Sequence, residues 1–457
     1  MKKSLIASLL PALLLTALLQ GCGGSSSNKP VAIVDPVEYT FSLKAELTND
    51  CGVASAFTDI ELLLQDDTWQ TLSVHQTDET GVISFVTTSE FINYTLVAKD
   101  QKDSDSEGLN VVSFYQANSA TPSTYQAQFD ESLDNSTCEC ITNNLELSHR
   151  PFSTQTSVTS SLDYVSWSAV ESDDTTTLFE GVEVCRIIDG AWPTHSFSVT
   201  GLDSNEAVIG SAGFIDNFQS DDTMNWSLAA FDVADEIELV IPHQAFTTNQ
   251  LIGNTIHFSE LIKEDAETLF VFDTHSNISE VFYQSQASVT FAESSSIFGS
   301  AVIKTHHQLI STKAEDSFMA KAEEESPAID DRFFSEIEDN GSYDYSAVSG
   351  FPIAVIAFTF TAFDPVTNLL IPAKWTFYGP RRGDLAISGP LTGYENIITL
   401  ETDKKTTEVH LIQSTMANNY QDYIQYYQSG NTVENALNAS NDFVKDLKQI
   451  EISISLN

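Results

Sequence analysis

Residues 39–47 read Tyr-Thr-Phe-Ser-Leu-Lys-Ala-Glu-Leu, with an apolar side chain at every second position. Successive side chains of a β-strand point to opposite faces of a sheet, so this alternation predicts a strand with one buried face. Residues 60–64, 72–74 and 237–241 show a similar alternation. Four further short segments are also interpreted as strands: 82–85, 94–98, 269–272 and 281–283. The sequence therefore predicts a mainly β protein.

The C-terminal part carries the longest strand pattern and the helical patterns. Residues 353–363 are almost all apolar, which predicts a central buried strand, and residues 450–456 alternate strictly, which predicts a terminal strand paired into a sheet. Asn431 and Glu434 fit a capping box before an apolar helix face that runs to Leu447. An earlier helix is indicated by Tyr420, Tyr423, Ile424 and Tyr427. We predict two or three β-sandwich-like domains, with one or two helices near the C-terminus.

A turn at residues 77–81, Thr-Asp-Glu-Thr-Gly, precedes Val-Ile-Ser-Phe at 82–85, and Tyr-Thr-Leu follows at 94–96. This run resembles the middle strands of carboxypeptidase-regulatory or transthyretin-like β-sandwich modules, over residues 60–98. The resemblance implies a β-sandwich fold and carries no implication about activity.

The N-terminus has the form of an export signal. Lys2 and Lys3 precede an apolar run at 5–19, which is shorter than the ~20 residues of a membrane-spanning helix. Leu19-Gln20-Gly21-Cys22 then resembles the bacterial lipobox, in which the cysteine thiol is acylated and becomes the new N-terminus. The resemblance implies a signal peptide at 1–21 and a lipid anchor, with palmitate, on Cys22. Gly23 stands where Asp would mark inner-membrane retention, so the implied location is the outer membrane, with the periplasmic or cell-surface face left open.

Composition limits the domain plan and the partners. The chain has 457 residues, too many for one typical core, and 20 Lys and Arg against 65 Asp and Glu give a net charge of −45. Such a charge excludes a nucleic-acid-binding role. We expect the following segments: a flexible tether at 22–37, β domains at 38–145 and 146–312, an acidic linker at 313–343, and a C-terminal β domain at 344–457.

Four cysteines remain once Cys22 is assigned to the lipid: Cys51, Cys138, Cys140 and Cys185. An even set in an exported protein predicts two disulfides. Two cysteines separated by one residue on a strand fit a mutual bridge poorly, so Cys138 and Cys140 should each pair outward, one with Cys51 and one with Cys185. A four-cysteine zinc site is the weaker alternative, because the paired C-x₂-C spacing is missing.

No sequence pattern indicates catalysis, a metal site or a cofactor. The chain has no nucleophile elbow, phosphate-binding loop, dinucleotide fingerprint or HExxH motif. The adjacent His306 and His307 would point to opposite faces of a strand and could not share a metal. Arg382-Gly383-Asp384 forms a candidate adhesive loop, expected at a loop tip between Gly379-Pro380 and the following strand.

These observations predict a non-catalytic outer-membrane lipoprotein with a structural or binding role at the cell envelope. Its partners would be the membrane, through the anchor, and an envelope protein or surface partner. One alternative is a surface coat, an adhesin or an appendage component of the flagellar-sheath type. Another is an extracellular hydrolase of polysaccharide or peptide, whose carboxylate pair the sequence does not locate.

Overall fold

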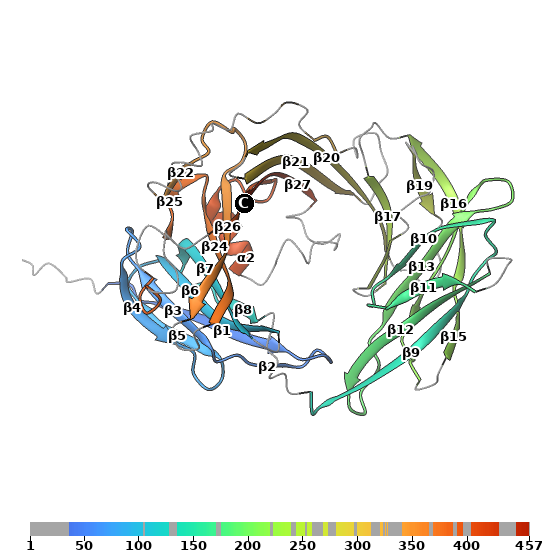
Figure 1. Cartoon of the computed structure of the whole chain (residues 1–457), viewed down its shortest axis with the longest axis horizontal. Coiled ribbons are helices and arrows are strands. Elements are labelled where there is room, and N and C mark those ends of the chain that lie inside the picture. The colour runs from blue at the N-terminus through green and yellow to red at the C-terminus, as the bar shows by residue number, and fades with distance from the viewer. Residues whose placement is uncertain are drawn as a thin grey trace, which may run out of the picture. The chain divides into compact units, whose positions relative to one another are not determined.

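The structure is a computed structural model. It describes residues 36–103, 106–127, 135–170, 175–219, 223–238, 244–251, 254–257, 268–272, 280–296, 299–311, 320–322, 325, 327, 341–364, 369–386, 391–395, 404–428 and 445–456. The chain divides into two units, 1–37 and 38–457, and all the elements described below belong to the second. These elements are almost all strands, which confirms the predicted mainly β fold (Figure 1).

A four-stranded sheet is organised around β1 (Tyr39–Thr48). This strand pairs antiparallel with β2 (Ala54–Ala56) and β5 (Val82–Thr87), and parallel with β8 (Ser123–Ala127). Phe41, Leu43 and Ala45 are buried, while the residues between them are half-buried or exposed. The strand predicted from residues 39–47 is confirmed, including its single buried face.

A twelve-stranded sheet makes up most of the rest of the unit. Its order is β18 (Asn254–His257), β17 (Gln244–Leu251), β20 (Glu280–Ser296), β21 (Gly299–Ser311), β27 (Asp446–Leu456), β26 (Lys404–Ser414), β23 (Ile353–Asp364), β24 (Leu369–Pro380), β7 (Ser106–Asn118), β6 (Phe91–Asp103), β3 (Ile60–Gln65) and β4 (Thr71–Gln76). The sheet joins strands from all three segments that the sequence analysis treated as β domains. The first segment joins the last through the parallel pairing of β24 with β7, which sets Trp375 opposite Val111. The middle segment joins the last through the antiparallel pairing of β21 with β27.

Two predicted strands of the C-terminal part hold interior positions in this sheet. β23 corresponds to the apolar run at 353–363 and lies between β24 and β26. β27 contains the alternating residues 450–456 and lies between β21 and β26, so the C-terminus is tied into the sheet. Both strand predictions are confirmed.

One helix, α2 (Tyr420–Gln428), is found among the described residues near the C-terminus. Asn419 caps it, because its side-chain oxygen accepts the backbone N–H of Asp422 at 3.0 Å, and the Asp422 carboxylate accepts the N–H of Asn418 in return. Tyr420, Tyr423 and Ile424 are buried in a core that also contains residues of β1, β3 and β6, and the helix packs on β7 and β24. The helix predicted from Tyr420 to Tyr427 is confirmed, whereas the helix predicted from Asn431 lies outside the described residues.

The middle of the chain forms two further sheets. A four-stranded sheet has the order β11 (Ser166–Ala169), β12 (Thr176–Ile187), β9 (Cys138–Ser148) and β15 (Thr223–Ser227). A five-stranded sheet has the order β10 (Thr154–Ser160), β13 (His195–Leu202), β14 (Val208–Ile215), β16 (Ala229–Glu238) and β19 (Thr268–Phe272). Leu147, Phe179 and Phe197 are fully buried in one core shared by these sheets, an arrangement that fits the predicted β-sandwich architecture.

Three hairpins share one turn geometry, at residues 66–70, 78–82 and 203–207. In each, an aspartate side chain accepts backbone N–H groups two and four residues later. The fourth residue has a positive φ: Trp69 at 62°, Gly81 at 75° and Glu206 at 64°. An aspartate that bonds its own turn and a left-handed residue three positions later form a type I turn with a bulge.

Candidate functional site

The predicted lipidation residue precedes the described part of the chain. Cys22 and nearly all of the tether lie before Pro36, the first described residue, so their predictions stay predictions. The linker predicted at 313–343 also lies largely outside the described residues. The remaining candidate residues can be placed on the fold.

The four remaining cysteines form two disulfides. Cys51 bonds to Cys138 with a Cα–Cα distance of 5.6 Å, and Cys140 bonds to Cys185 with a Cα–Cα distance of 4.0 Å. Cys140 and Cys185 stand directly opposite each other on β9 and β12. The prediction that Cys138 and Cys140 each pair outward is confirmed, and the structure settles which partner each one takes.

Arg382, Gly383 and Asp384 form β25 (Arg382–Asp384) rather than the expected loop tip. This short strand pairs antiparallel with β22 (Ser342–Asp344), so that Tyr343 lies opposite Gly383. The carbonyl oxygen of Asp384 accepts a hydrogen bond from the buried indole of Trp69 at 3.0 Å. The Arg382 and Asp384 side chains are exposed, but their backbone is fixed by the strand pairing and by Trp69.

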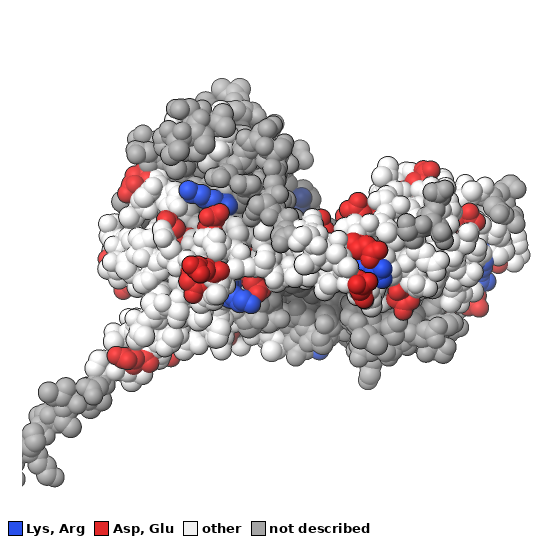
Figure 2. Space-filling model, turned by 90° about the horizontal axis from the view of Figure 1, so that it is seen from below, with Lys and Arg blue, Asp and Glu red and all other residues white. Residues whose placement is uncertain are grey.

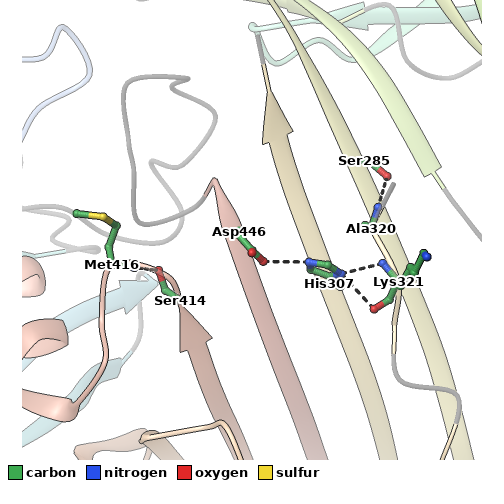
Figure 3. Close-up of polar contacts among 7 residues, drawn as sticks. All are labelled: Ser285, His307, Ala320, Lys321, Ser414, Met416 and Asp446. Atoms are coloured by element: carbon green, nitrogen blue, oxygen red, sulfur yellow. Dashed lines mark hydrogen bonds and ion pairs between the residues drawn. The ribbon is translucent and has the colours of Figure 1, made fainter. Parts of the chain in front are cut away.

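His307 makes polar contacts with two parts of the chain, as Figure 3 shows. Its Nε2 lies 3.0 Å from Asp446 Oδ1 on β27, and its Nδ1 accepts the backbone N–H of Lys321 at 2.8 Å. Nδ1 also lies 3.1 Å from the carbonyl oxygen of Lys321. His306 projects to the opposite face, and burial lowers its pKa, with a smaller contribution from the neighbouring His307. The two rings therefore lie on opposite faces of β21 and do not face one common site.

The chain at residues 320–322 is fixed to β20 and β21 by these contacts. The N–H of Ala320 donates to Ser285 Oγ at 3.0 Å, and both residues are fully buried. Figure 3 also shows Met416, whose N–H donates to Ser414 Oγ at 3.2 Å in the turn after β26. These bonds hold chain segments in place. None of them joins a nucleophile to a general base.

Among the described residues, no strand pairs with the outer edge of β4 in the twelve-stranded sheet. β4 ends the sheet, and Leu72 and Val74 are 64% and 45% exposed on it. On the other face of the strand, the His75 ring stacks on Phe85 with centroids 4.3 Å apart, which anchors β4 to the core. The alternation at 72–74 indicated a strand, but nothing in the sequence showed that its second edge is open.

Carboxylates lie at both ends of β4. Asp66 and Asp67 precede it, Asp78 and Glu79 follow it, and the strand itself carries no Asp, Glu, Lys or Arg. The hydroxyl of Thr68 and then backbone N–H groups lower the pKa of Asp66, while the hydroxyl of Thr80 and backbone N–H groups do the same for Asp78. Both are therefore ionised at neutral pH. Figure 2 shows more acidic than basic residues on the described surface of the face that it presents.

No group of three or more His, Cys, Asp or Glu residues within the described ranges could hold a metal ion. No helix in that part of the chain has the length and apolar character needed to cross a membrane.

Comparisons with known proteins add little. No protein-family model matches the sequence, and no curated protein matches it. Among solved structures, a Streptococcal ancillary pilin aligns with 54% of this chain and 89% of its own, at 9% identity and a TM-score of 0.12. A likeness at that score carries no argument about fold or function.

Proposed function

We propose that this chain is a non-catalytic lipoprotein of the outer membrane with a structural or binding role at the cell envelope. The observation that carries the proposal is the use of its cysteines. The chain has five cysteines, and two disulfides occupy four of them. Cys22 therefore has no cysteine left to pair with inside the chain, which suits the acylated residue of a lipobox.

The disulfides also support export from the cytoplasm. Disulfides persist in oxidising compartments and are rare where glutathione and thioredoxin keep thiols reduced. A cross-link from the turn between β1 and β2 to β9, and a second one between β9 and β12, fit a protein that functions in the periplasm or on the cell surface. Several acyl chains on Cys22 would then hold the folded unit at the membrane, since each buried CH₂ contributes about 0.8 kcal/mol.

Two observations support the binding role: the open edge of β4, and the structural character of the polar contacts among the described residues. The polar side chains described above bond to one another or to the backbone. Their contacts hold strands and neighbouring segments together. An exposed strand edge with apolar side chains, in contrast, is a surface that a partner can cover.

Membrane fractionation tests the anchor. The wild-type protein should be in the outer-membrane fraction, and the Cys22→Ala variant should leave it. A Cys51→Ala/Cys138→Ala variant is the matched control, because it removes two cysteines without touching the lipobox and should stay membrane-bound. Retention of the Cys22→Ala protein in the membrane would contradict the proposal.

Protease treatment of intact cells that carry a C-terminal tag tests the membrane face. Loss of the tag would place the folded unit outside the cell and support a coat or adhesive role. Protection until the outer membrane is opened would place it in the periplasm. An assembly or scaffold role would then follow, and adhesion through Arg382–Asp384 would be excluded.

A further inference from the structure

Within the described part of the chain, no strand pairs with β4 on the side away from β3. Thr77 N–H bonds to Ile60 C=O, and Ile60 begins β3, the neighbour of β4. Bonded and non-bonded pairs alternate along antiparallel strands, so the N–H and C=O groups of Val74 and Gln76 point away from β3. An added strand would find both donors and acceptors there, together with the exposed side chains of Leu72 and Val74.

We propose that the open edge of β4 binds an extended peptide with an uncharged, partly apolar centre and basic residues at both ends. The incoming peptide would add a strand to the twelve-stranded sheet. Its backbone would bond to Val74 and Gln76, and its side chains would cover Leu72 and Val74. This inference gives a location and a partner class to the binding role proposed above.

The charges at the two ends of β4 decide the kind of partner. Asp66 and Asp67 lie at one end and Asp78 and Glu79 at the other, about as far apart as an added strand of six residues is long. Lysine or arginine at each end of the incoming peptide would meet an ionised carboxylate, which favours association and sets the register.

The same charges disfavour a second copy of the chain as the occupant. If β4 paired with β4 of another copy antiparallel, the turn at 66–70 of one chain would face the turn at 78–82 of the other. If the pairing were parallel, each turn would meet its own copy. Both arrangements bring carboxylates together in a chain of net charge −45, and like charges placed opposite each other are destabilising.

The test measures binding of a fluorescent peptide by anisotropy, with the full chain in mild detergent. The probe alternates threonine and valine and carries two lysines at each end; a second probe has glutamates in place of the lysines. The lysine probe should bind, and the glutamate probe should bind at least about tenfold more weakly, because it meets like charge at both ends. The result does not depend on whether Cys22 is acylated, so failure here is distinguishable from failure of the anchor.

Two variants locate the site on β4. Val74→Pro removes a donor on the open side and leaves the pairing with β3 intact, so it should weaken binding about tenfold or more. The Leu72→Lys/Val74→Lys variant places cations on exposed positions and should abolish binding of the lysine probe. The Asp67→Asn/Glu79→Gln variant removes one negative charge at each end of β4. It should bind the lysine probe more weakly, and its affinity should depend less on salt concentration.

A matched control lies on another edge strand. Trp167 is 44% exposed on β11, which ends the four-stranded sheet, and Trp167→Ser should leave binding unchanged. Equal binding of the two probes, or no binding of the lysine probe, would overturn the proposal. Loss of binding in Trp167→Ser but not in the β4 variants would also overturn it. The same holds if the wild type self-associates and the Leu72→Lys/Val74→Lys variant does not.

Discussion

The indole N–H of Trp375 donates a hydrogen bond to the hydroxyl of Ser113, 2.8 Å away in the buried core. This bond starts a chain that crosses four strands. The Ser113 hydroxyl bonds to that of Thr95 at 2.7 Å, Thr95 donates to Gln65 Oε1 at 2.7 Å, and Gln65 Nε2 donates to the carbonyl oxygen of Trp69 at 3.0 Å. All five residues are buried. This series of hydrogen bonds fixes β24 against β7, where distant parts of the sequence pair in one sheet.

Ser113→Ala should destabilise the fold by about 1–3 kcal/mol, because it leaves the Trp375 indole without an acceptor in the core. Thr95→Val should have a cost of the same order, since it interrupts the same chain of bonds. Urea unfolding measures both changes. The double variant should cost less than the sum of the two, because both substitutions disrupt one network. Full additivity, or a cost for Ser113→Ala no larger than that of the exposed Ser89→Ala control, would contradict the network.

Removing either disulfide should destabilise the folded unit by about 4 kcal/mol on the loop-entropy model. The cysteines of the Cys51–Cys138 bond are separated by 87 residues and those of the Cys140–Cys185 bond by 45. The loops do not overlap, so Cys51→Ser/Cys138→Ser should cost about 0.6 kcal/mol more than Cys140→Ser/Cys185→Ser. Urea unfolding of the two double variants shows which disulfide contributes more to the free energy of unfolding. Peptide mapping that found Cys138 joined to Cys140 would refute the pairing itself.

Glu206→Gly should stabilise the protein by up to about 1 kcal/mol. Glu206 has a φ of 64°, a left-handed conformation that costs most residues roughly 1–2 kcal/mol, and glycine avoids that cost but loses more freedom on folding. Gly81→Ala is the opposite test at the equivalent turn position, because its Cβ would collide with the carbonyl oxygen of Ala45. Gly81→Ala should lower the melting temperature. A higher melting temperature would contradict the positive φ and the close backbone contact at Gly81.

The turn aspartates should make stability fall in acid. Bonds from the Thr80 hydroxyl and from backbone N–H groups lower the pKa of Asp78, and backbone N–H groups of Ala207 and Asn205 lower that of Asp203. A lowered pKa in the folded state contributes stability above the unfolded pKa of about 3.9, and this contribution is lost as pH falls through the folded value. Asp78→Asn/Asp203→Asn should therefore lose less stability than wild type between about pH 5 and pH 3. A steeper loss in the variant would contradict the assignment.

The sequence predicted local features well because they depend on local patterns. The alternation at 39–47 and 450–456 determined which residues face a core, and the spacing of Cys138 and Cys140 limited the disulfides to outward pairing. Alternation does not identify the neighbouring strand, however, so the parallel contact of β24 with β7 was not predictable. The strand at Arg382–Asp384 was missed for a similar reason. Its partner, Ser342–Asp344, lay at the end of a segment assigned to an acidic linker.

The proposed function depends first on the chemistry of Cys22, and mass spectrometry of the N-terminal peptide of the mature protein tests it most directly. Residues 1–21 should be absent, and the chain should begin at Cys22 with acyl groups on that residue. Palmitate label should be incorporated into the wild type and not into Cys22→Ala. A mature chain that begins at another residue, or that carries an unmodified Cys22, would contradict the proposed function.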